Sequence, residues 1–183
     1  MEMSDEQILE LLAEKKTFER GFKALMGKYQ ERLYWHVRRM VTSHEETDDV
    51  LQNTFVKAFK GLSTFRGGST LYTWLYRIAT NEALNALKKM KRIKTYDGGE
   101  GDLEIMDTLA SDAWFDGDAA QAKLLAAVGT LPDKQKAVFN LKYHEDMSYA
   151  QISDITGTSV GALKASYHHA VKKIESYLTQ RVS

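Results

Sequence analysis

Apolar side chains recur at spacings of three and four along most of this 183-residue chain, whereas no stretch keeps the strict alternation of a β-strand. The longest stripe begins near Thr17 and continues through Leu25, Tyr29, Leu33 and Val37. A helix with such a stripe carries one apolar face, which is stable only when other helices cover it. The pattern therefore predicts an all-α fold.

Capping residues and breaks in the periodicity predict where the helices begin and end. Thr42 and Ser43 each stand three residues before a glutamate, and Ser148 stands three residues before a glutamine, which is the capping-box pattern of a helix start. Pro132 suits the first position of a helix, and Gly157 suits the residue just beyond the end of one. The helices expected from these signals cover about residues 5–13, 17–40, 43–62, 70–94, 119–129, 132–144, 149–156 and 159–179.

The net charge of zero conceals a segregation of charge along the chain. Residues 1–96 carry 17 basic side chains against 12 acidic ones, residues 97–120 carry eight acidic side chains and no basic one, and residues 121–183 carry eight basic against five acidic. We expect two small helical domains, residues 1–96 and 121–183, joined by a flexible acidic linker at residues 97–120. The two basic blocks favour polyanionic partners.

Composition excludes several classes of protein and of site. The chain has no cysteine, which excludes a disulfide framework, a thiolate metal site and a cysteine nucleophile. No apolar run reaches the roughly 18 residues of a membrane span, and the acidic N-terminus is unlike a signal peptide. The sequence also shows no nucleophile–base set and no glycine-rich phosphate loop. We therefore expect a cytoplasmic protein that is not an enzyme, with no catalytic residues, no cofactor, no metal site and no direct insertion into a membrane.

The two predicted helices at residues 149–156 and 159–179, joined by a short turn after Gly157, form a helix-turn-helix pattern. Ile152, Ile155, Val160, Leu163, Ala170 and Ile174 are expected to pack the pair together. The second helix would then present polar side chains to a DNA major groove, which admits an α-helix. An ordinary helical hairpin is the alternative explanation.

A second pattern lies on the predicted helix at residues 70–94. Polar and basic side chains at steps of four, four, three and four share one face of it: Arg77, Asn81, Asn85, Lys88 and Arg92. Binding to phosphates requires such a row. The alternative is a solvated helix whose cations lie favourably at its C-terminal end.

Six of the 19 aromatic side chains fall between residues 55 and 76. Aromatic rings beside basic residues can stack on unpaired bases, whereas aromatic rings at helical spacing more often belong to a core. We expect Phe55, Phe59 and Trp74 to be core residues.

Three motifs, in order and in register, resemble those of one known family. Residues 49–55, DVLQNTF, resemble the D-L-V-Q-E-T-F stretch of bacterial RNA polymerase sigma factors. Residues 65–69, FRGGS, with residues 72–81, YTWLYRIATN, resemble their segment that melts the promoter and binds its −10 element. Residues 131–132, LP, with 148–153, SYAQIS, and 159–164, SVGALK, resemble the helix-turn-helix that reads the −35 element. The layout is similar to that of the small extracytoplasmic-function (ECF) group.

The resemblance implies a transcription initiation factor with three sets of binding residues. Core polymerase, a partner through its β′ and β subunits, would be bound by Asp49, Leu51, Gln52, Asn53 and Val56. The helix that carries Asp49, Gln52 and Asn53 would contact the coiled-coil clamp of the β′ subunit. The melted −10 strand would be bound by Phe65, Arg66, Ser69, Arg77, Asn81, Asn85, Lys88, Lys89 and Arg92. The −35 duplex would be bound by Ser159, Lys164, Ser166, His168, His169 and Lys172. The partners implied are core polymerase, promoter DNA as duplex and as melted single strand, and an anti-sigma factor.

The sequence departs from the family at the recognition helix. Sigma factors often carry arginines at positions that here hold Ser166, His169 and Val171. Serine and valine cannot make the bidentate contacts to phosphate or guanine that arginine makes, so contacts to the −35 element should differ here.

Two other functions fit parts of the pattern. A stand-alone helix-turn-helix regulator would bind DNA without core polymerase, so co-purification with polymerase separates it from a sigma factor. An all-α enzyme or adaptor that uses a cleft between Phe65 and Trp74 is the other alternative, and a failure to bind promoter DNA would favour it.

Overall fold

The computed structural model describes residues 3–41, 43–97 and 119–180, and within these ranges every regular element is a helix. The helices of the first half are α1 (Asp5–Ala13), α2 (Phe18–Arg38), α3 (His44–Gly61) and α4 (Leu71–Asp97), with a short 3₁₀ helix η1 at Leu62–Thr64. Those of the second half are α6 (Ala119–Gly129), α7 (Asp133–Tyr143), α8 (Tyr149–Thr156) and α9 (Val160–Gln180). None of the described helices is both long enough and apolar enough to cross a membrane.

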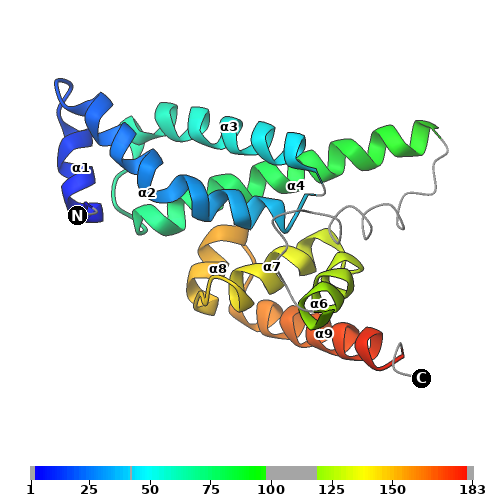
Figure 1. Ribbon diagram of the computed structural model, residues 1–183. Coiled ribbons are helices and arrows are strands. Elements are labelled where there is room, and N and C mark those ends of the chain that lie inside the picture. Colours follow the sequence, from blue (N-terminus) through cyan, green and yellow to red (C-terminus); the bar gives the residue numbers. More distant parts are fainter. Residues whose placement is uncertain (1–2, 42, 98–118, 181–183) are drawn as a thin grey trace.

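In the first half, α2, α3 and α4 pack together, and α1 lies against α2 (Figure 1). The apolar stripe of α2 is buried as its spacing predicts, with Leu25, Leu33 and Val37 fully covered. Gly21 allows the close approach of α1, because a Cβ atom at this position would lie 2.9 Å from Cβ of Leu11. This bundle fixes α3 and α4, the two helices that carry the first two sets of candidate residues.

In the second half, α9 packs against α6, α7 and α8. The side chain of Ser148 caps α8 by accepting a hydrogen bond from the Gln151 amide, and Gly157 ends that helix in the left-handed conformation at φ 68°. Ile152, Ile155 and Leu163 are buried between the helices. The result is the helix-turn-helix that the sequence predicts.

The two halves lie directly against each other (Figure 1). Both α7 and α8 contact α4. A single cluster of buried apolar side chains contains Tyr76 and Leu87 of α4 together with Leu141, Met147 and Ile152 of the second half. The described part of the chain is therefore a closed arrangement in which the helix-turn-helix rests on the first bundle.

Most predicted helix limits agree with the structure within one or two residues, and five details differ or lie outside it. Pro132 is the residue before α7 and not its first residue. Phe59 and Val160 are 49% and 38% exposed, so neither is the core residue that we expected, whereas Phe55 is buried. Thr42 and the linker residues 98–118 lie outside the described residues.

Candidate functional site

One exposed face of α3 carries the first set of candidate residues. Ser43 fixes the start of α3, because its side chain accepts a hydrogen bond from the Glu46 amide. Asp49, Gln52 and Asn53 are exposed one turn further along the helix. Val56, at 45% exposure, continues this face, which we call the α3 surface. The α3 surface can meet a partner without any change in the bundle.

Leu51 differs from the other members of this set. Its side chain is 8% exposed and belongs to the buried core, so it positions α3 and does not lie on the α3 surface. Phe59 extends the exposed apolar area instead, because it lies one turn beyond Val56 and its ring packs edge-on against Phe18 and Phe22 at 5.3 and 5.1 Å.

The loop between η1 and α4 positions the aromatic part of the second set. Gly67 adopts the left-handed conformation at φ 73°, and the Thr70 hydroxyl accepts a 3.1 Å hydrogen bond from the Thr73 amide at the start of α4. The rings of Phe65 and Trp74 lie 5.1 Å apart and pack against each other. Because the two rings are in contact, there is no open cleft between Phe65 and Trp74. Arg66 and the partly exposed Ser69 lie on the surface of the loop.

Helix α4 carries the polar row predicted from the sequence, which we call the α4 row: Arg77, Asn81, Asn85, Lys88 and Arg92. All are exposed except Arg77, which is half-buried and whose Nε has no hydrogen-bond partner in the described part of the chain. Lys89 is exposed beside the row. Every member of the row except Arg77 lines a cleft of about 840 Å³ between α4 and the first turn of α7.

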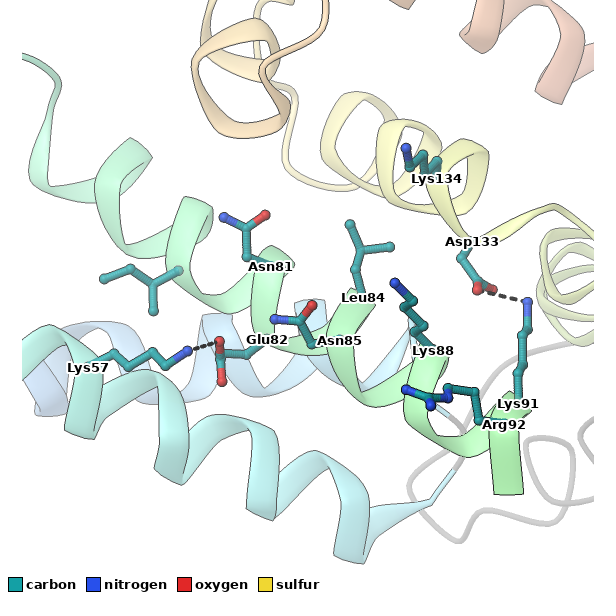
Figure 2. Close-up of a pocket in the computed structure, with 11 residues that line it drawn as sticks. Lys57, Asn81, Glu82, Leu84, Asn85, Lys88, Lys91, Arg92, Asp133 and Lys134 are labelled. Atoms are coloured by element: carbon teal, nitrogen blue, oxygen red, sulfur yellow. Dashed lines mark hydrogen bonds and ion pairs between the residues drawn. The ribbon is translucent and has the colours of Figure 1, made fainter. Parts of the chain in front are cut away.

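Figure 2 shows that this cleft is mainly basic. Lys91 crosses it to form a 2.7 Å ion pair with Asp133 at the start of α7, and Lys134 lines the same side. At the other end, Lys57 of α3 forms an ion pair with Glu82. Lysine and arginine outnumber acidic side chains among the residues that line the cleft, which suits a polyanionic ligand.

The third set lies on the exposed face of the helix-turn-helix. Five of its six members are exposed, Ser159, Lys164, His168, His169 and Lys172, whereas Ser166 is only partly exposed. The ring centroids of His168 and His169 are 6.1 Å apart, and Nζ of Lys164 lies 5.9 Å from the ring centroid of Tyr149 in α8. These side chains lie along the recognition helix, where they can contact a DNA duplex without any rearrangement of the helices of the second half.

A fourth polar constellation joins the two halves, and no pattern in the sequence indicates it. Glu145 lies in the turn between α7 and α8. Its carboxylate accepts a 2.7 Å hydrogen bond from the Tyr76 hydroxyl and forms a 3.2 Å ion pair with Arg39. Arg32 lies 3.7 Å and the Tyr72 hydroxyl 3.4 Å from the same carboxylate. Burial together with Glu145 raises the pKa of Tyr72 to about 12 and moves the pKa of Tyr76 in the same direction. We call these four partners, Arg32, Arg39, Tyr72 and Tyr76, the Glu145 pocket.

Comparison with known families identifies two matching segments. Residues 25–93 match the model of sigma-70 region 2, and residues 121–174 match the model of sigma-70 region 4. The RNA polymerase sigma-H factor of Pseudomonas aeruginosa is 30% identical over 182 residues, which is 95% of this chain and 93% of that protein. The ECF RNA polymerase sigma factor SigW of Bacillus subtilis is 28% identical over 173 residues, which is 90% of this chain and 92% of that protein.

Solved structures show a similar fold. CnrH in complex with the cytosolic domain of CnrY has a TM-score of 0.67 at 21% identity, over 97% of this chain and 99% of that one. The sigma factor RpoE in complex with the anti-sigma factor NepR, from Bartonella quintana, also has a TM-score of 0.67 at 21% identity, over 86% of this chain and 96% of that one. The all-α fold predicted from the periodicity is therefore confirmed.

Proposed function

The chain belongs to the ECF group of bacterial RNA polymerase sigma factors, and from that membership we propose how its helices divide the work of promoter recognition. It is a transcription initiation factor that binds core RNA polymerase and directs it to promoter DNA. In our proposal, residues 1–96 bind polymerase and the −10 element, residues 121–183 bind the −35 element, and residues 97–120 connect them.

The α3 surface is proposed to bind the coiled-coil clamp of the polymerase β′ subunit. Asp49, Gln52 and Asn53 supply exposed charge and amide groups, and Val56 with Phe59 supplies an apolar border. Interfaces often place an apolar anchor beside polar groups, and the anchor carries much of the binding energy. Leu51 contributes indirectly, by holding α3 in the bundle.

The α4 row is proposed to hold the melted non-template strand of the −10 element. The observation that carries this assignment is the alignment of two amides with basic side chains along one accessible face of α4. Amide side chains can bond to the edges of unpaired bases, while lysine and arginine contact the phosphates. Phe65, Arg66 and Ser69 lie in the loop at the start of the same helix, where a base that leaves the duplex could be received.

The helix-turn-helix is proposed to read the −35 duplex through the exposed face of α9. Lys164 and Lys172 supply permanent positive charge, and His168 and His169 supply hydrogen-bond donors near the middle of the helix. Ser166 stands where sigma factors often have arginine, so we expect this position to contribute less of the binding energy.

Further parts of the proposal concern location and partners. We place the protein in the cytoplasm, where core polymerase works, and we assign it no catalytic activity of its own. An anti-sigma factor is a further proposed partner, because one of the similar solved structures is a sigma factor in complex with the anti-sigma factor NepR.

Run-off transcription with core polymerase on a genomic DNA library would identify promoters that depend on this chain. On such a promoter, holoenzyme that carries Asn81→Ala with Asn85→Ala should open closed duplex more slowly than wild type and should lose less activity on a pre-melted bubble. Gln30→Ala, on the exposed face of α2, is the control. Equal opening rates for the double variant and the wild type would remove the α4 row from the melting step.

A further inference from the structure

One buried carboxylate takes part in the contact between the two halves. The side chain of Glu145 is 8% exposed, although it belongs to a turn between helices. One of its oxygens lies 3.2 Å from Arg39, and the other accepts the 2.7 Å hydrogen bond from Tyr76. A carboxylate loses much of its hydration when it is buried, so it is stable there only with cationic and hydrogen-bonding partners. The Glu145 pocket supplies both kinds of partner from α4 and from the C-terminal end of α2.

The turn that carries Glu145 is held in a defined conformation. The backbone amides of His144 and Glu145 both donate to the carbonyl of Asn140, at 3.0 and 3.3 Å. Asp146 adopts a positive φ of 49°, which few residues other than glycine adopt. The amide of Met147 then closes the turn by donating to the carbonyl of Leu141. The turn is thus built to project Glu145 away from its own half.

Other interactions from α7 and α8 cross the same boundary. The side-chain amide of Asn140 donates a 3.4 Å hydrogen bond to the Arg39 carbonyl, and the Lys91–Asp133 ion pair closes the far end of the cleft. Beyond Glu145 along the chain, α8 packs on α4 within one continuous apolar core. The surface covered here is polar at its edges and apolar at its centre, as in a specific interface.

Closure has a direct consequence for the proposed DNA-binding surfaces. The α4 row faces the first turn of α7 across the cleft (Figure 2). The helix-turn-helix rests on the helix that carries the row (Figure 1). The −10 and −35 elements lie at separate positions along a promoter. A chain that binds both elements at once must separate its two halves, so the contact of α7 and α8 with α4 has to open.

We propose that Glu145 acts as an intramolecular latch, which holds the free sigma factor in a closed state that competes with promoter binding. This inference rests on the proposed function of the α4 row. Binding to polymerase and DNA withdraws Glu145 from Arg39 and Tyr76, and the free energy of closure is subtracted from that of promoter binding. The latch therefore sets how readily the free chain changes to the open form.

The absence of native cysteine allows a clean distance measurement on the full chain. Spin labels on Glu45→Cys in α3 and Glu175→Cys in α9, both exposed, report the separation of the two halves by pulsed electron resonance. The labelled protein with Glu145 intact should give one narrow distribution of label-to-label distances. This distribution should shift to longer distances when core polymerase is added. Glu145→Gln should move most of the free population to longer, broader distances, and Tyr76→Phe, which removes only a hydroxyl, should move a smaller part. Asp154→Asn, an exposed carboxylate on α8, is the matched control and should leave the distribution narrow.

Circular dichroism melts confirm that each variant is folded, and Tyr76→Phe keeps the test valid if Glu145→Gln does not fold. A broad, long distribution in the free protein with its latch intact would refute closure, and a narrow distribution in folded Glu145→Gln would refute the role of Glu145. In run-off transcription at limiting sigma factor, Glu145→Gln should give about threefold or more product, because it no longer has to open. If Glu145→Gln is open in the distance measurement but gives the same amount of transcript as the wild type, closure does not compete with promoter binding. Transcription by the wild type would still support the proposed function.

Discussion

Nε2 of His36 in α2 lies 2.9 Å from Oγ1 of Thr80 in α4, and both side chains are fully buried. The imidazole also packs against the ring of Tyr76, with ring centroids 5.0 Å apart. Burial, together with the charges of Arg39 and His144, lowers the pKa of His36 to about 3. The link between α2 and α4 therefore depends on a histidine that stays neutral in the folded protein.

The stability of the fold should consequently fall as the solution becomes acidic. An unfolded histidine has a pKa near 6.5, so the unfolded chain binds a proton at position 36 between about pH 6.5 and 3 while the folded chain does not. Each pH unit below about 6.5 should cost roughly 1.4 kcal/mol of unfolding free energy from this residue alone. Urea unfolding at pH 7, 6 and 5 measures the slope.

His144 acts in the same direction, because burial and Arg39 lower its pKa to about 4. His36→Gln should make the pH dependence shallower, and a second substitution, His144→Gln, should reduce it further. His168→Gln, on the exposed face of α9, is the control that keeps the wild-type slope. If stability stays constant between pH 7 and 5 in the wild type, the assignment of a neutral buried His36 is wrong.

The α3 surface gives a prediction about polymerase. Asp49→Ala combined with Gln52→Ala removes two exposed groups that lie one helical turn apart. The pair should weaken binding to core polymerase by roughly 2 kcal/mol, or about 30-fold, if the residues lie at the centre of the interface. Titration of labelled protein with core polymerase measures the loss, and Glu19→Ala, exposed on α2, serves as the control. An unchanged dissociation constant in a folded double variant would exclude this face.

Two glycines of α2 offer a matched pair for the packing of α1. A Cβ atom at Gly21 would lie 2.9 Å from Leu11, whereas one at Gly27 meets nothing within 4 Å. Gly21→Ala should therefore destabilise the protein by about 1–3 kcal/mol through overpacking. Gly27→Ala should stabilise it by about 0.5–1 kcal/mol, because alanine is the better helix former. Thermal melts distinguish the two, and an equal shift of both in one direction would contradict the close contact of α1 with α2.

The contrast between local and distant information explains what the sequence could predict. Helix limits follow from residues three or four positions apart, so Ser43 and Ser148 identify the starts of α3 and α8. The rows on α4 and α9 are likewise properties of single helices. The prediction that Phe59 is a core residue is wrong, because periodicity shows the apolar face of a helix but not where the neighbouring helix stops covering it.

The Glu145 pocket could not be predicted from the sequence, because local patterns do not show which distant residues come into contact. Tyr76 and Arg39 precede Glu145 by 69 and 106 positions along the chain. Nothing in the residues around Glu145 specifies which helix it will meet, and a charged residue in a turn is ordinarily solvated. The pocket exists only because both α7 and α8 pack against α4, a relationship that local patterns do not encode.

The histidines on α9 predict a pH dependence of binding to the −35 element. His168 and His169 are exposed on the recognition helix, where phosphates or base edges are expected. A nearby phosphate favours the protonated imidazole, so formation of the complex should take up protons and the affinity should rise as the pH falls from about 8 to 6. Each contact should contribute on the order of 1 kcal/mol, comparable to a hydrogen bond to a charged group in a wet interface, while Lys164 gives a share independent of pH. Holoenzyme binding to a −35 duplex at fixed salt measures the profile, with the double variant His168→Gln and His169→Gln for comparison. A flat wild-type profile, or a slope that persists in the double variant, would show that these side chains only cover the helix surface.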